Sequence, residues 1–303
     1  MTHYYRAYGL NFSSEWQFPE LPVQDPMPDS QIDVHIRAGA VPESLDNPTS
    51  SGVLYEASAD LFLLNLQGIG RYLIRNGDEI IIERCADASD NDVRVFLLGS
   101  GFGALLHQRQ LLVIHAGAIY SEHGAVLFSG PSGAGKSTLL GEMIRRGYNM
   151  MVDDVCAVTL DSDEKPLVLP GYPRTRLWAD SAEKLEVSTD GLQKTRPTLE
   201  KYERQLPDQF HASNAQMHRI YLLNSHNTDK LELEPLPAIN TFAAVLHNTY
   251  RNSFLEGLEM RETHFAMVSA LATNVSVVKV VRPSGSFRLT ELADLIEADL
   301  HTA

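Results

Sequence analysis

The residues best suited to chemistry form a glycine-rich segment near the middle of the 303-residue chain. Gly130, Gly135, Lys136 and Ser137 satisfy the spacing G-x-x-x-x-G-K-[ST]. In such a loop, backbone N–H groups surround a polyanion, the lysine reaches the β- and γ-phosphates of a nucleotide, and the hydroxyl ligates Mg²⁺. We therefore predict a site for ATP and Mg²⁺ formed by Gly130, Pro131, Ser132, Gly133, Ala134, Gly135, Lys136, Ser137 and Thr138.

Two adjacent carboxylates follow this loop. Asp153 and Asp154 come directly after the apolar run YNMMV, so that a carboxylate there can approach the Mg²⁺ ion or the γ-phosphate. Because neighbouring residues at the end of a strand point in different directions, one aspartate can hold metal while the other accepts a proton from an attacking hydroxyl. The pair favours phosphoryl transfer, and two solvated aspartates in a turn are the alternative.

Short apolar runs identify the elements that must position these residues. The run AVLFS before the loop favours a strand and STLLGEMIRR after it a helix, whose N-terminus attracts phosphate. We expect further strands over 111–120, 148–152, 156–160, 219–224 and 275–281, and further helices over 239–250 and 290–300, the latter with Thr290 as its N-cap. Residues 195–217 are polar and interrupted by proline, which predicts a mobile surface loop or lid with Arg196, Lys201 and Arg204 solvated.

The first part of the chain has a different pattern. Its apolar residues come in short runs typical of an antiparallel β unit, and Asn76-Gly77 predicts a two-residue hairpin turn, because both residues tolerate positive φ. A helical spacing follows over 91–109. The predicted organisation is a β-rich N-terminal domain over 1–90 and a catalytic domain over 91–303.

The composition restricts the partners. The chain has 25 basic and 39 acidic residues and a formal charge of -14, which disfavours nucleic acid and suits a small molecule or a protein or peptide with basic character. The two cysteines, Cys85 and Cys156, are far apart and predict no zinc site. No run is long enough to cross a membrane and no signal peptide precedes the first strand, so we expect a cytoplasmic protein without a membrane partner.

Four elements in order resemble the catalytic domain of the bacterial HPr kinase/phosphorylase family, which shares its core with phosphoenolpyruvate carboxykinase. They are a strand with His115 and Gly117, the loop from Gly130 to Ser137, the helix end Arg146-Gly147-Tyr148, and Val152-Asp153-Asp154. The resemblance implies an α/β fold in which a P-loop kinase core follows a β-rich N-terminal domain. It also implies that Asp153 is the general base toward a serine hydroxyl, that Asp154 is a metal carboxylate, and that His115 tunes the base. By its residue type alone, His115 would be a hydrogen-bonded strand histidine.

The next segment departs from that family. The signature Glu-Val-Arg-Gly-Leu-Gly is absent, and PGYPRTRLWADSAEKL stands at the comparable distance. This segment and the N-terminal YRAYGLNFSSE resemble a diverged HPr-kinase-related group, some members of which phosphorylate a serine of a lasso-type precursor peptide. In an extended segment, Arg174 and Arg176 would face one side and clamp the transferred phosphoryl group or an acidic peptide terminus. Surface pairing with Asp180 or Glu183 is the alternative.

Together these features predict an ATP- and Mg²⁺-dependent serine kinase. Lys136 would neutralise the transferring phosphoryl group and Asp153 would take the hydroxyl proton. The expected partner is a protein or peptide that carries an acceptor serine, and the resemblance implies a homo-oligomer, since the family forms hexamers. Two alternatives stay open, namely a small-molecule kinase and a nucleotide-binding sensor without phosphotransfer.

Overall fold

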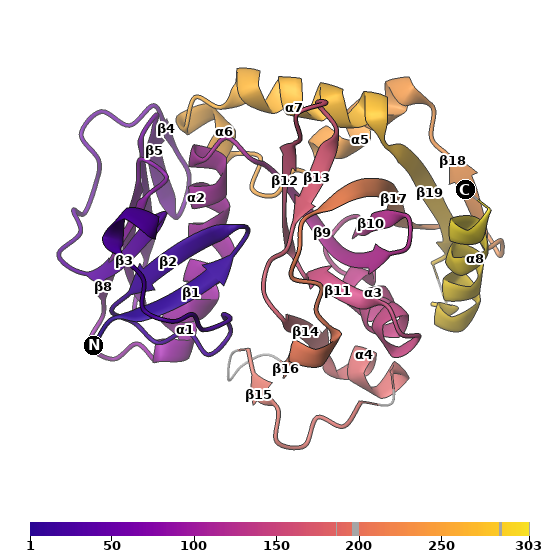
Figure 1. Ribbon diagram of the computed structural model, residues 1–303, viewed down its shortest axis with the longest axis horizontal. Coiled ribbons are helices and arrows are strands. Elements are labelled where there is room, and N and C mark those ends of the chain that lie inside the picture. The colour runs from indigo at the N-terminus through magenta and orange to yellow at the C-terminus, as the bar shows by residue number, and fades with distance from the viewer. Residues whose placement is uncertain (186, 196–199, 285–286, 303) are drawn as a thin grey trace. The chain divides into compact units, whose positions relative to one another are not determined.

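The computed structural model describes residues 1–185, 187–195, 200–284 and 287–302 (Figure 1). The chain forms two compact units, each built from two stretches of sequence. Unit 1 contains Met1–Val113 and Tyr250–Met267, and unit 2 contains Ile114–Thr249 and Val268–Ala303. Residues 91–113 therefore lie in unit 1 rather than with the glycine-rich loop. The reason is packing within that unit: the Gln108 side chain bonds Gly77 N and Ile74 O, and Tyr72 donates to Val93 O.

Unit 1 is built on one eight-stranded sheet with the order β1-β2-β3-β8-β7-β6-β5-β4. The strands are β1 (His3–Ala7), β2 (Leu10–Ser14), β3 (Val34–Ala38), β4 (Ser50–Ser51), β5 (Tyr55–Ser58), β6 (Leu61–Leu66), β7 (Gly70–Arg75) and β8 (Glu79–Arg84). The sheet is mixed, which corrects the expectation of an antiparallel unit, because β3 runs parallel to both β2 and β8. The proline-rich connection over 15–33 returns the chain to the start of β2, which makes the parallel pairing possible.

The hairpin predicted at Asn76-Gly77 is confirmed. Asn76 has φ 54° and Gly77 φ 69°, and Arg75 pairs with Glu79, so the connection has three residues rather than two. The helix predicted over 91–109 also forms, as α1 (Asp90–Phe96), a π-helical turn (Leu97–Gly101) and α2 (Phe102–Gln108). Ser89 caps α1, since its side chain accepts the Asp92 N–H. The short helix α6 (Phe254–Gly257) completes this unit, and α7 (Arg261–Asn274) has residues in both units.

Unit 2 contains a second eight-stranded sheet, and the strands expected around the glycine-rich loop are all present. They are β9 (Leu112–Ser121), β10 (Gly124–Ser129), β11 (Asn149–Val152), β12 (Val155–Leu160), β13 (Pro166–Leu169), β17 (Ala215–His226), β18 (Glu232–Pro235) and β19 (Ser276–Pro283). The order is β10-β9-β12-β13-β17-β19-β18, with β11 paired to β9. Because β10 also pairs with β17, the path through the first five strands closes on itself, and β10, β17 and β19 are parallel.

Helices α3 (Lys136–Arg145) and α8 (Leu289–His301) enclose one core with these strands. Leu139, Leu140 and Met143 of α3 and Leu292 and Ile296 of α8 are buried in it, and burial of such a side chain contributes about 1.5–3 kcal/mol. Arg146 ties the two helices together through Glu142, Asp294 and Glu297. Thr290 lies inside α8, whose N-cap is Arg288, and helix α5 (Ala238–His247) forms close to its predicted place.

A third sheet lies outside the main one, with the order β14-β16-β15. Its strands are β14 (Arg174–Trp178), β15 (Gln193–Lys194) and β16 (Lys201–Gln205), and the helix α4 (Ala179–Lys184) follows β14. The surface loop expected over 195–217 is thus wrong for β16 and for the start of β17, whereas residues 196–199, with Arg196, lie outside the described residues.

No helix in the described ranges has an apolar stretch long enough to cross a membrane.

Candidate active site

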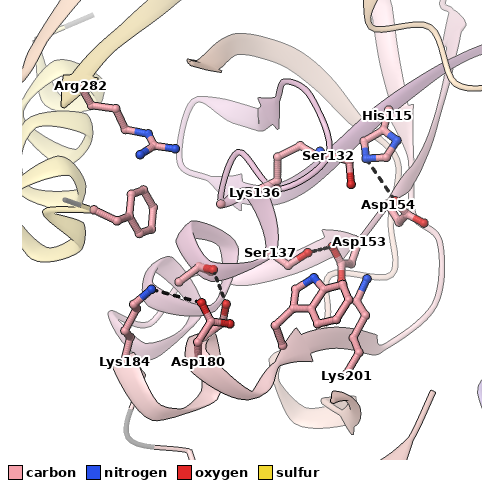
Figure 2. Close-up of a pocket in the computed structure, with 16 residues that line it drawn as sticks. His115, Ser132, Lys136, Ser137, Asp153, Asp154, Asp180, Lys184, Lys201 and Arg282 are labelled. Carbon is pink, nitrogen blue, oxygen red and sulfur yellow. Dashed lines mark hydrogen bonds and ion pairs between the residues drawn. The ribbon is translucent and has the colours of Figure 1, made fainter. Parts of the chain in front are cut away.

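The glycine-rich loop connects β10 to α3 and borders a cavity of about 450 Å³ (Figure 2). Its backbone requires glycine. Gly130 has φ 145°, and a Cβ there would lie 2.3 Å from Leu223 O, while Gly135 has φ 89° and its Cβ would meet the Phe287 ring at 2.9 Å. A side chain at either position would displace the strand or ring packed on the loop. The strand–loop–helix arrangement predicted for phosphate binding is therefore present.

Of the predicted cofactor-binding residues, six line the cavity and three support it. The lining residues are Ser132, Gly133, Gly135, Lys136, Ser137 and Thr138. Lys136 Nζ donates to the carbonyl oxygens of Gly130 (2.9 Å) and Pro131 (3.0 Å), and the Ala134 carbonyl accepts from Arg282. Burial lowers the pKa of Lys136, and the negative charges of Asp154 and Asp153 partly offset this decrease. A buried ammonium held at the base of the loop is placed to meet a phosphate.

Asp153 is bonded to the glycine-rich loop. Its Oδ1 accepts from Ser137 Oγ at 3.0 Å and its Oδ2 from the backbone N of Arg176 at 2.9 Å. Burial and the adjacent Asp154 charge raise the pKa of Asp153 above its ordinary value, and the two hydrogen bonds oppose that rise. Both oxygens of Asp153 are therefore oriented before any ligand binds, and one of them meets the hydroxyl expected to ligate a metal.

Asp154 points to a different neighbour. Its Oδ1 lies 3.4 Å from His115 Nε2, and both side chains are 31% exposed where they line the cavity. Asp154 has φ 83°, a left-handed conformation that aspartate tolerates better than most residues. This conformation, in the two-residue turn between β11 and β12, separates the two carboxylates, so that Asp153 meets Ser137 and Asp154 meets His115 (Figure 2).

These side chains fit a magnesium ion bound together with a nucleotide. Mg²⁺ prefers oxygen ligands and usually combines one or two carboxylates with substrate phosphates and water. The Ser137 hydroxyl and the Asp153 carboxylate are such oxygens, and they are hydrogen-bonded to each other. Within the described ranges, no group of three or more His, Cys, Asp and Glu side chains could hold a metal by itself. Substrate phosphates and water would supply the remaining ligands of a Mg²⁺ ion here.

Arg174 and Arg176 lie away from the cavity lining. Arg174 is 3% exposed, with Nη1 2.8 Å from Glu203 Oε1, and Arg176 Nε is 3.6 Å from the same oxygen. The register of β14 against β16 places Arg176 opposite Glu203, which explains why this carboxylate, rather than Asp180 or Glu183, pairs with the arginines. The phosphoryl clamp expected from the two guanidinium groups is not formed in this arrangement.

Other side chains complete the cavity, and none of them is among the predicted site residues. They are Trp178, Asp180, Ser181, Lys184, Lys201, Arg282 and Phe287. Arg282 Nη2 donates to Ala134 O at 2.9 Å, and its guanidinium lies 4.7 Å from the Phe287 ring centroid. Arg282 could have been found from its place at the carboxyl end of a parallel strand, where ligands of α/β sheets bind. Lys201 and Trp178 meet only through the pairing of β14 with β16.

Comparisons with known proteins give a weak structural similarity and no sequence match. No protein-family model matches it. No curated protein matches it either. Among solved structures, it is similar to the Hpr(Ser) kinase/phosphatase from Coxiella burnetii, with 12% sequence identity over 63% of this chain and 91% of that chain and a TM-score of 0.33. So low a score carries no conclusion about activity.

Proposed function

We propose that unit 2 is a phosphotransferase that moves the γ-phosphoryl group of Mg²⁺-bound ATP to a serine hydroxyl of a protein or peptide. The observation that carries this proposal is the divergence of two adjacent carboxylates beside the glycine-rich loop. Asp153 bonds to Ser137 and Asp154 faces His115, and all four line one cavity with Lys136. Phosphoryl transfer needs a metal carboxylate and a proton acceptor at nearby but separate positions.

The contacts favour an exchange of the two aspartate roles that the family resemblance implied. In our proposal Asp153 is the metal carboxylate, because it already bonds the Ser137 hydroxyl and both its oxygens are held. Bound Mg²⁺ would supply charge neutralisation at the phosphates. Asp154 is the general base, because it is open to the cavity and adjoins an imidazole that can orient it and share its proton.

The cavity also has the charge that a nucleotide requires. Its lining combines Lys136, Lys184, Lys201 and Arg282 with three aspartates, whereas the whole chain carries a formal charge of -14. Cations are thus concentrated where an anion would bind. The acceptor class rests on the sequence resemblance alone, with a lasso-type precursor peptide as the specific candidate.

The test uses the whole chain, γ-labelled ATP with Mg²⁺, and serine-containing peptides that include a lasso-type precursor. We expect label on serine, and Lys136→Met should lower transfer at least about 1,000-fold, because a charge on the phosphates is lost. Lys165→Met, at an exposed position of unit 2, is the matched control and should behave as wild type.

Two outcomes would contradict the serine kinase. If ADP forms only with a small metabolite, the enzyme is a small-molecule kinase. If ATP binds tightly and no acceptor takes label, the protein is a nucleotide sensor. Asp153→Asn and Asp154→Asn separate these cases further, because a sensor would lose no turnover through either substitution.

A further inference from the structure

The reacting end of the cavity needs more positive charge than Lys136 alone provides. A phosphoryl group in transfer carries negative charge on three oxygens, and phosphotransferases place cations from outside the loop against it. Lys136 Nζ is already shared between two loop carbonyls, and Arg174 and Arg176 are turned to Glu203. Another cation must approach from a different element.

Lys201 is the first residue of β16 and stands directly opposite Trp178 in the register with β14. Both residues line the cavity. Lys201 Nζ lies 5.6 Å from the Trp178 ring centroid, within the range in which an aromatic face attracts a cation. Figure 2 shows the Lys201 side chain extending toward Asp153. The indole therefore supports the ammonium at the end of the cavity where the two aspartates lie.

The surroundings leave this ammonium available to a ligand. Among the described side chains, no carboxylate lies within ion-pair distance of Lys201 Nζ, in contrast to Lys184, which bonds Asp180, and Lys194, which bonds Glu200. Lys201 lines the same cavity as Asp153 and Lys136, which brings its charge to the proposed reacting groups.

We propose that Lys201 is a second catalytic cation, whose ammonium donates to the oxygens of the transferring phosphoryl group while Trp178 positions it. This inference rests on the proposed phosphotransfer. In that step a bond forms between the acceptor serine oxygen and the γ-phosphorus, and the bond from the γ-phosphorus to the bridging oxygen breaks. ADP leaves with the electron pair, and the serine proton passes to the Asp154 carboxylate. Lys201 contacts the phosphoryl group throughout and exchanges no proton.

The test compares binding of MgADP alone with binding of MgADP plus aluminium fluoride, a mimic of the phosphoryl group in transfer that needs no identified acceptor. Wild type should bind MgADP more tightly when aluminium fluoride is present than when it is absent. Lys201→Met should lose about 100-fold of the affinity for the fluoride complex and less than threefold of that for MgADP, because the contact exists only with the mimic. Lys201→Arg should recover most of the loss, and Trp178→Leu should lose about tenfold, because the ammonium is no longer supported.

Lys194→Met is the matched control. Lys194 belongs to the same small sheet, but it bonds Glu200 and does not line the cavity. If wild type gains affinity with fluoride and Lys201→Met gains as much, the role of Lys201 is refuted and the phosphotransferase stands. If wild type binds MgADP but gains nothing from fluoride, the proposed phosphotransfer itself fails, and the role of Lys201 fails with it.

Discussion

Units 1 and 2 differ in the buried side chains that contact backbone carbonyls. In unit 1 buried side chains such as His107 and Tyr72 contact backbone carbonyls as neutral groups, 2.9 Å from Tyr250 O and 3.1 Å from Val93 O. Unit 2 places charged groups in comparable positions, because Lys136 and Arg282, 7% and 8% exposed, both donate to carbonyls of the glycine-rich loop.

Under the proposed function, this difference separates residues that serve folding from residues that would serve a ligand. A neutral buried donor with a partner costs little, whereas a buried cation without a counter-ion costs several kcal/mol. Among the described side chains, no carboxylate lies within ion-pair distance of Lys136 or Arg282, and both cations lie beside a loop whose backbone could receive an anion. The strained turn at Asp154 lies in the same place. The buried side chains that contact carbonyls are thus neutral in the examples from unit 1, whereas in unit 2 they are cations beside the glycine-rich loop.

The largest expected effects separate the two aspartates of unit 2. Asp154→Asn should lower kcat about 100- to 10,000-fold, because the proton acceptor is lost. Asp153→Asn should instead raise the Mg²⁺ concentration needed for half-maximal activity about 10- to 100-fold, because a metal carboxylate is lost. Phosphotransfer measured over a Mg²⁺ titration gives both values.

Neither substitution should destabilise the fold, which provides the control. Burial raises the pKa of Asp153, so its charged form opposes folding, and a neutral Asn should leave the urea midpoint unchanged or raise it. The proposed assignment is wrong if Asp153→Asn abolishes kcat at saturating Mg²⁺ while Asp154→Asn shifts only the Mg²⁺ requirement.

The next effect tests the buried charges that serve folding in unit 2. Glu203→Gln leaves Arg174 and Arg176 facing each other without their shared carboxylate, which should lower the free energy of unfolding by about 3 kcal/mol. Trp178, on the same small sheet, reports this unfolding by fluorescence in a Trp16→Phe background. Glu200→Gln, which removes the exposed partner of Lys194, should change little. Equal midpoints for the two variants would show that the Glu203 pair contributes nothing.

A pH-dependent effect of similar size is expected in unit 1. Burial lowers the pKa of His107 from 6.5 to about 4. Between pH 6.5 and pH 4 the His107 side chain is protonated in the unfolded chain but neutral in the folded state. The free energy of unfolding therefore keeps its full contribution from His107 above pH 6.5 and decreases as the pH falls toward 4. The loss approaches about 3 kcal/mol. Trp16 fluorescence in a Trp178→Phe background follows urea unfolding of unit 1.

The matched variant for this prediction is His107→Gln, which keeps an N–H donor for Tyr250 O but has no charge to gain. Its stability should fall less steeply than that of wild type over the same pH interval. The other histidines are identical in both proteins, so only the difference between the two slopes counts. Parallel slopes would mean that His107 does not determine the acid sensitivity of unit 1.

The smallest effect concerns the cap of α1 in unit 1. Ser89 Oγ accepts the Asp92 N–H at 3.1 Å, so Ser89→Ala should cost about 1 kcal/mol in unfolding free energy. Phosphotransfer should be unchanged, since this residue belongs to the unit without the cavity. A clear loss of phosphotransfer by the folded Ser89→Ala variant would contradict the assignment of activity to unit 2 alone.

Much of the site could be read locally. The loop, Lys136, Ser137 and the aspartate pair are close in sequence, and the strands and helix around them follow from short-range apolar patterns. The arginines show where this reasoning ended. The extended segment on which their expected orientation depended is present as β14, but which group they face depends on Glu203, which lies 29 residues from Arg174 along the chain.

By itself, the sequence determined that a glycine-rich loop joins a strand to a helix and that two carboxylates follow at the end of another strand. These are consequences of glycine torsions and of apolar periodicity, which act over a few residues. Only the tertiary structure shows that Asp153 bonds Ser137 and that Asp154 faces His115. It also shows that Arg174 and Arg176 pair with Glu203. Lys201 and Arg282 likewise reach the cavity only in the folded chain. Those outcomes depend on strand register and on burial, which join residues that no local pattern relates.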